Sequence, residues 1–217
     1  MKLVKLFIVA AVLAVATPAF SQDVNFGVLA GMNFANASAK TEGNDVDDLK
    51  TKLGLNIGAF VDFNFSEKLA LETGLQFEQK GTKFENENKE FGIPIKVTQK
   101  MIVNYLTIPV NARLNLPVGD NNLYFLAGPT LGIGLSGKTT LEVGDEEESE
   151  DLKFGDDEES DIKRLNIGTR LGVGFELSNK LGIRCTYELG LSNLMPEGDS
   201  DNSTKFNAFG IALTYKF

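Results

Sequence analysis

The 217-residue sequence contains no histidine, no tryptophan and a single cysteine, Cys185. Without histidine, the chain cannot build a Ser-His or Cys-His nucleophilic site or a histidine-ligated metal site. With one cysteine, it cannot form an intramolecular disulfide. Carboxylates are the catalytic groups that remain, and no pair of them stands out in the sequence. We therefore expect no enzyme activity, no cofactor and no metal site.

Long apolar runs are also missing, apart from one near the start of the chain. Two lysines precede the apolar stretch Leu6–Ala16, which ends shortly before Ala19-Phe20-Ser21. This layout is typical of a secretory signal peptide. We expect residues 1–21 to be that signal peptide and residues 22–217 to be one exported domain. No other stretch approaches the roughly 20 apolar residues that a spanning helix needs, so membrane insertion would have to use strands.

Acidic residues outnumber basic ones, with 30 Asp and Glu against 21 Lys and Arg and a formal net charge of −9. Loss of the two signal-peptide lysines would change this charge to −11. A surface this acidic disfavours nucleic acid and provides no basic patch for anionic lipid headgroups. We therefore expect no nucleic-acid partner.

After residue 23, large apolar residues alternate with Gly, Asn, Thr or charged residues in repeated segments. A period of two is the pattern of β-strands. Eight such segments are predicted, at residues 24–34, 54–65, 69–78, 105–116, 123–136, 165–177, 181–192 and 205–217. Pro109 lies inside the fourth segment. Because proline costs a ladder hydrogen bond, it predicts a bulge or a local break there.

The connections between these segments alternate in length. Tight turns are predicted at residues 66–68, 117–122 and 178–180, and long loops near residues 36–52, 81–100, 137–163 and 193–204. An even strand number with short turns on one side and long loops on the other is typical of bacterial outer-membrane barrels, in which both termini are periplasmic. We therefore predict an all-β fold, an eight-stranded antiparallel up-and-down transmembrane β-barrel.

The alternation by itself does not tell which face lies inside, because a soluble barrel of lipocalin type has the same period with its apolar face inward. The polar face here is rich in Gly with scattered Asn, Glu and Arg, whereas a solvent-facing surface usually carries many Lys and Glu. Small residues suit the crowded interior of a narrow barrel, which leaves the bulky apolar residues facing lipid. The membrane barrel is favoured, and a soluble ligand-binding barrel is the alternative.

Aromatic residues gather at the strand ends beside the short turns, where they predict a periplasmic girdle. They are Phe63, Phe65, Phe125, Phe175, Tyr215 and Phe217. The last strand ends on the aromatic Phe217, which resembles the signal read by the barrel-assembly machinery. We expect this machinery and outer-membrane lipid as partners, and a location in the outer membrane of a Gram-negative bacterium.

Seven charged residues fall on the predicted interior faces: Glu72, Glu78, Arg113, Arg170, Glu176, Arg184 and Glu188. A narrow eight-stranded barrel is filled by side chains, and charges buried in it have to pair. Pairs such as Glu72 with Arg113, or Arg184 with Glu188 or Glu176, would complete an interior salt-bridge network. We interpret this network as structural rather than catalytic or ion-conducting.

The longest predicted loop contains two acidic runs, residues 144–151 and 156–161, within the segment 142–161. Carboxylate oxygens suit Ca²⁺, but their spacing does not match that of an EF-hand loop. We expect a solvated, mobile external loop whose like charges repel each other, with cation binding as the alternative.

Several short motifs follow one another in order along residues 24–217. They are Leu71-Glu72-Thr73-Gly74-Leu75, Lys80-Gly81, Tyr105-Leu106-Thr107-Ile108-Pro109-Val110, Leu126-Ala127-Gly128-Pro129, Asn166-Ile167-Gly168 and Gly172-Val173-Gly174. In order and spacing they resemble the PorT-like family of outer-membrane barrels, which is related in architecture to the small OmpX and OmpA barrels. Thr107 departs from the family, which usually has an acidic residue there. The resemblance implies an outer-membrane location, and the founding member of the family is associated with protein secretion.

We expect a non-enzymatic outer-membrane protein with a structural or interaction role, as an accessory to secretion or adhesion that contacts an unidentified partner through its long loops. A narrow channel for small solutes, a lipid-modifying barrel enzyme and a soluble ligand-binding barrel are the rival functions.

Overall fold

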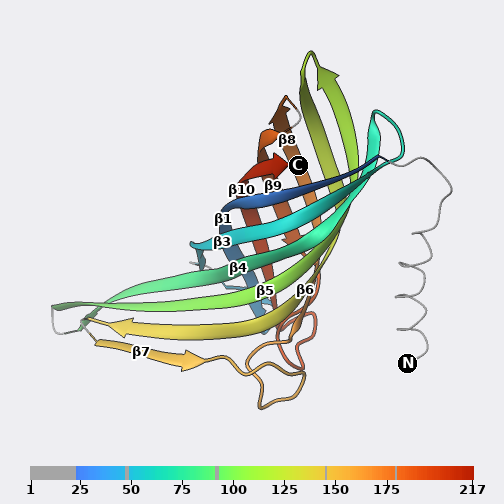
Figure 1. The fold of residues 1–217 in the computed structure, drawn as a ribbon. Helices are drawn as coiled ribbons and strands as arrows, with labels where there is room; N and C mark the ends of the chain where they lie inside the picture. Colours follow the sequence, from blue (N-terminus) through green and yellow to red (C-terminus); the bar gives the residue numbers. More distant parts are fainter. Residues whose placement is uncertain (1–22, 47–48, 91–92, 145, 179) are drawn as a thin grey trace.

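The computed structural model describes residues 23–46, 49–90, 93–144, 146–178 and 180–217 (Figure 1). The predicted signal peptide, residues 1–21, lies outside the described residues. The described chain is all-β. None of its residues forms a helix that is long and apolar enough to cross a membrane.

Ten strands are formed by the described residues. They are β1 (Asp23–Thr41), β2 (Asn44–Asp45), β3 (Leu49–Asn64), β4 (Leu69–Glu90), β5 (Ile93–Val118), β6 (Asn121–Val143), β7 (Glu146–Asp151), β8 (Leu165–Leu177), β9 (Leu181–Gly190) and β10 (Ser203–Lys216). Eight of them form a ring in the order β1-β3-β4-β5-β6-β8-β9-β10, and β10 pairs with β1 to close it. The antiparallel eight-stranded barrel predicted from the sequence is confirmed.

The seam between the first and last strands of the ring is long and regular. Residues Gly27–Lys40 of β1 pair with Ser203–Lys216 of β10 without a register shift. The Phe217 amide adds a hydrogen bond of 3.0 Å to the Phe26 carbonyl. Because every strand of the ring has two neighbours, the barrel wall leaves no open sheet edge.

Side chains alternate between the two faces of the wall. On β10, Phe209, Ile211 and Leu213 are exposed on the outside, whereas Ala212 and Thr214 are buried inside. The bulky apolar residues thus face outward and the small and polar residues inward, as the sequence predicts. The interior leaves little room, since a Cβ at Gly174 would lie 2.2 Å from the Tyr124 ring.

The short connections lie together at one end of the barrel. β5 and β6 are joined by only Gly119 and Asp120, and Gly119 has φ 61°. A positive φ at the first of two hairpin residues favours glycine. Asp23, at the start of β1, pairs with Asn64 at this end, and the last strand also finishes here. The arrangement matches the periplasmic end of a bacterial barrel.

The prediction of long irregular loops at residues 81–100 and 137–163 is wrong for much of their length, because β4, β5, β6 and β7 run through them. β1 and β3 shorten the predicted loop 36–52 in the same way. The apolar alternation stops where lipid contact stops, whereas backbone hydrogen bonds can extend a ladder further. We call the parts of β4 beyond Lys80, β5 before Asn104 and β6 after Leu135, together with β7, the tongue. Figure 1 shows it projecting away from the barrel.

Of the bulge or local break predicted at Pro109, the structure shows the local break. The register of β5 against β4 is the same on both sides of it, with only the two pairs between Val110 and Thr107 missing. The Thr73 hydroxyl donates a 2.8 Å hydrogen bond to the Pro109 carbonyl, so the interruption stays local. A register shift lies instead between Asn104 and Tyr105, at the root of the tongue.

Candidate functional site

Charged side chains fill the barrel interior in two layers. The lower layer, nearer the short turns, contains Asp62, Glu72, Arg113, Glu176, Arg184 and Lys216. Arg113 is its centre, with Nη1 3.2 Å from Glu72 and Nη2 2.7 Å from Glu176. The same guanidinium lies 3.3 Å from Asp62. One arginine on β5 therefore contacts carboxylates from three other strands.

Two further cations complete the lower layer. Arg184 donates two hydrogen bonds to Glu72, of 2.8 and 2.6 Å, which is the strong bidentate geometry. The Lys216 ammonium lies 2.8 Å from Asp62 and 3.1 Å from Glu176. Three cations thus face three carboxylates, and the layer is formally neutral.

Aromatic rings hold the two arginines of the lower layer in place. The Arg113 guanidinium lies 3.7 Å from the centroid of the Tyr124 ring, and that of Arg184 lies 5.0 Å from the centroid of Phe60. Arg184 also donates a 3.0 Å hydrogen bond to the Tyr124 hydroxyl. Cation–π contact is strengthened by desolvation, so both buried rings stabilise the arginines by packing against them. Tyr124 also stabilises Arg184 by accepting its hydrogen bond.

The upper layer is built around Arg170. Its guanidinium lies 2.7 Å from Glu78 and 2.6 Å from Glu188, and the Lys80 ammonium contacts the same two carboxylates. Two cations therefore balance two carboxylates. Thr107 is also buried and carries no charge. The four charges of this layer balance without a carboxylate at that position.

The structure buries all seven charged residues that the sequence assigned to the interior: Glu72, Glu78, Arg113, Arg170, Glu176, Arg184 and Glu188. It brings Glu72 and Arg113 together as expected. Arg184, however, pairs with Glu72 and not with Glu188 or Glu176. The reason is geometric, because β9 and β4 lie on opposite walls of the ring and long side chains meet across a narrow interior.

Asp62, Lys80 and Lys216 are further members of the network that were not predicted from the sequence. The signal was present, since Lys80 comes two residues after Glu78 and Lys216 two residues after the inward-facing Thr214. Positions at even spacing along a strand share a face. Both lysines are therefore predictable as interior residues from the strand period alone.

Apolar side chains close the end of the barrel opposite the short turns. Val103, Tyr105 and Phe206 point inward from the wall and are fully buried. Ile162 and Leu194, from the connections before β8 and before β10, pack against them. We call this cluster the cap. It places a dehydrated apolar layer above the upper charge layer.

Backbone hydrogen bonds fix the connections that contribute to the cap. The Lys163 amide donates to the Leu194 carbonyl at 2.8 Å, and the Leu194 amide donates to Thr204 at 2.8 Å. The segment before β8 was predicted to be a mobile loop. Its apolar residues Phe154 and Ile162, set in an acidic stretch, were the sequence signal that it folds back onto the barrel.

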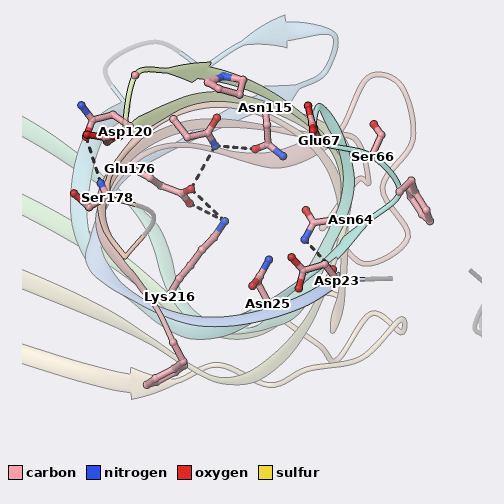
Figure 2. A pocket seen from close by; sticks show the side chains of 16 residues that line it. Asp23, Asn25, Asn64, Ser66, Glu67, Asn115, Asp120, Glu176, Ser178 and Lys216 are labelled. Atoms are coloured by element: carbon pink, nitrogen blue, oxygen red, sulfur yellow. Dashed lines mark hydrogen bonds and ion pairs between the residues drawn. The ribbon is translucent and has the colours of Figure 1, made fainter. Parts of the chain in front are cut away.

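A polar vestibule occupies the barrel mouth beside the short turns, with a volume of about 1000 Å³. Figure 2 shows Glu176 and Lys216 at its inner side and Asp23, Glu67 and Asp120 around its opening. The Lys216 ammonium donates to Glu176 at 3.2 Å. The vestibule therefore ends at the lower charge layer.

The described residues contain no group of three or more Cys, Asp or Glu side chains placed to hold a metal ion. Most of the first acidic run forms strand β7, paired with β6, instead of the irregular loop that the sequence predicted. The carboxylates of a strand alternate between two faces, which spreads them apart.

One protein family and several solved structures are similar to this chain. The family model described as "Outer membrane protein beta-barrel domain" matches residues 20–195. Among solved structures, the chain is similar to Neisserial surface protein A (12% identity, 90% of this chain and 99% of that chain, TM-score 0.42). It is also similar to Ail, the attachment invasion locus protein of Yersinia pestis (14%, 90% and 99%, 0.40), and to OprG from Pseudomonas aeruginosa (14%, 90% and 97%, 0.38). No curated protein matches the chain.

Proposed function

Because the chain belongs to the outer membrane protein β-barrel domain family, we propose that it is a non-enzymatic, non-conducting barrel that works through contacts with other proteins. The observation that carries this proposal is the closed interior. Two neutral layers of buried ion pairs and an apolar cap lie one above another between the two mouths. A barrel without a passage has to act through its exposed ends.

The energy of the interior supports a closed state. A solute that crossed the barrel would have to separate the contacts of Arg113 and Arg170, which are buried. Breaking a buried ion pair by removing one partner costs about 3–5 kcal/mol. Opening both layers would therefore be rare without a large rearrangement of the wall.

The resemblance to PorT-like barrels supports an accessory role in protein secretion as the first process to test, with adhesion as the second. Both processes need a surface outside the lipid. The tongue provides one, because it extends beyond the ring and its β7 strand is exposed throughout. Lipid contact by the outward apolar residues would only anchor the barrel.

A narrow solute channel is the rival function, favoured by the vestibule of about 1000 Å³. Conductance in planar bilayers separates the two. We expect no steady current from the refolded barrel, with a general porin in the same bilayer as the positive control. A difference in gel migration between the unboiled and the boiled sample would show that the barrel is folded. A stepwise current that grows with inserted protein would overturn the proposal.

A further inference from the structure

The tongue lies outside the lipid-facing band of the barrel. On the outer face of the wall, exposed apolar residues continue to Leu53 on β3 and Leu135 on β6. Beyond them the same face carries Lys83, Lys100 and Lys138 on the strands of the tongue. A row of lysines does not fit a lipid-embedded surface, so the tongue projects into water.

The outer face of the tongue is already satisfied by ion pairs. Lys100 contacts Glu142, and Lys50 and Lys83 both contact Glu85. Hydrogen bonds from Lys50 and Lys83 lower the pKa of Glu85 to about 2. Lysines and glutamates therefore lie beside each other on the strands of this face, as is normal for a solvent-facing surface.

The inner face of the tongue, which continues the interior face of the barrel wall, carries exposed apolar residues, with the polar Gln99 opposite Leu141. Near the root, Met101 packs against the cap. Further out, Leu141 and Val143 on β6 are 41% and 40% exposed, and Val97 on β5 lies directly opposite Val143. An exposed apolar face outside the lipid and beside a polar rim is typical of an interaction site.

Three glutamates form one border of this apolar face. Glu146 lies opposite Val143 and Glu148 opposite Leu141, and Glu150 follows on the same side of β7. All three are exposed, and no ion pair of the described residues includes them. Glu147 and Asp151 point to the other face of the same strand.

We propose that the inner face of the tongue binds a basic amphipathic polypeptide segment of another protein. Apolar residues of the segment would cover Leu141 and Val143, and its Lys or Arg residues would face Glu146, Glu148 and Glu150. The inference rests on the proposed function, because it names the partner chemistry for a barrel that acts through contacts.

Charge complementarity selects this occupant. An acidic segment would place like charges against the β7 border, which costs free energy. A wholly polar basic segment would pair with the glutamates but leave the apolar face in water. Only a segment with both basic and apolar residues satisfies the two halves of the surface.

The test uses the refolded barrel in phosphatidylcholine nanodiscs and a fluorescein-labelled peptide of alternating Lys and Leu. A Lys-Ser peptide of the same length and charge is the reference probe, and empty nanodiscs give the background. Two double variants change charge equally on the two faces of one strand, E146Q/E148Q on the inner face and E147Q/D151N on the outer face. A third variant, L141S/V143S, removes only the apolar contact.

We expect E146Q/E148Q to weaken binding of the Lys-Leu peptide about fivefold, since two partly exposed ion pairs are lost. E147Q/D151N should change binding of this peptide less than about twofold. These two residues lie on the outer face of β7, so they attract the peptide only at long range. L141S/V143S should weaken the Lys-Leu peptide and leave the Lys-Ser peptide unchanged. Equal effects of the two charge variants, or wild-type binding no stronger than the background, would overturn the inference. Neither result would bear on conductance, so the proposed function is judged separately.

Discussion

Arg113 is the residue on which the lower charge layer depends. It contacts Glu72, Asp62 and Glu176 and donates a 2.8 Å hydrogen bond to Asn115. Its stem and guanidinium are buried. A carboxylate left without its cation in such a place keeps its desolvation cost and loses the attraction that offsets it.

The variant Arg113→Ala is therefore expected to destabilise the folded barrel by about 3–5 kcal/mol. The measurement is the temperature at which the unboiled protein loses its folded migration on gels. Lys138→Ala, which removes an exposed lysine of the tongue, serves as the control and should migrate like the wild type. An unchanged transition in Arg113→Ala would show that the network is not required for stability.

At the scale of elements, the strands of the wall serve two purposes along their length. Within the ring they carry the alternation that separates lipid from the packed interior. Past the register shifts at Thr51/Asn56 and Asn104/Tyr105, β4 and β5 continue as the tongue. Register shifts of this kind bend a strand and increase its twist, which fits the departure of the tongue from the barrel (Figure 1).

Shortening the tongue should leave the barrel intact. Glu85 and Thr98 lie opposite each other on β4 and β5, so replacement of residues 86–97 by Asn-Gly gives a two-residue hairpin of a favoured type. We expect the free energy of unfolding in urea to change by less than about 1 kcal/mol, as for surface changes in general.

The contrasting variant is Leu194→Ala, which removes a fully buried side chain of the cap and should cost about 2–5 kcal/mol. If shortening the tongue destabilised the barrel as much as this cap variant does, the tongue would be part of the folding core. The division between a stable ring and a projecting surface would then be wrong.

For the whole molecule, the acidic net charge of −9 is not located in the interior. Both charge layers are balanced, the lower by three cations against three carboxylates and the upper by two against two. The excess negative charge therefore lies at the two solvent-facing ends. This distribution keeps the wall compatible with lipid while the ends stay hydrated.

Insertion into the outer membrane involves the whole molecule, and we propose that the end of the last strand carries the signal read by the barrel-assembly machinery. Phe217 is 75% exposed, and only its backbone amide bonds the neighbouring strand, at Phe26. Phe217→Ala should therefore refold in detergent like the wild type but reach the outer membrane of cells in several-fold lower amount. Phe65→Ala, an exposed aromatic at the same end, is the control and should insert normally. Equal insertion of both variants would count against a signal at Phe217.

The sequence by itself determined the properties that depend on local periodicity. Alternation along each segment fixed the eight strands of the ring and the residues that share a face. The reason is that a strand has a period of two whatever its neighbours are. The small residues of the polar face then determined that Ile211 and Leu213 point outward and that Glu72 and Arg113 point inward. The β8 segment, predicted at residues 165–177, has the same bounds in the structure.

Only the tertiary structure decided which of these residues meet. Arg184 reaches Glu72 because ring closure sets β9 and β4 opposite each other across a narrow interior. Ile162 and Leu194 become a cap because the barrel mouth offers them an apolar surface to cover. The tongue continues because a paired strand extends its neighbour through backbone hydrogen bonds. These bonds depend little on the identity of the side chains, so the sequence pattern does not reveal them.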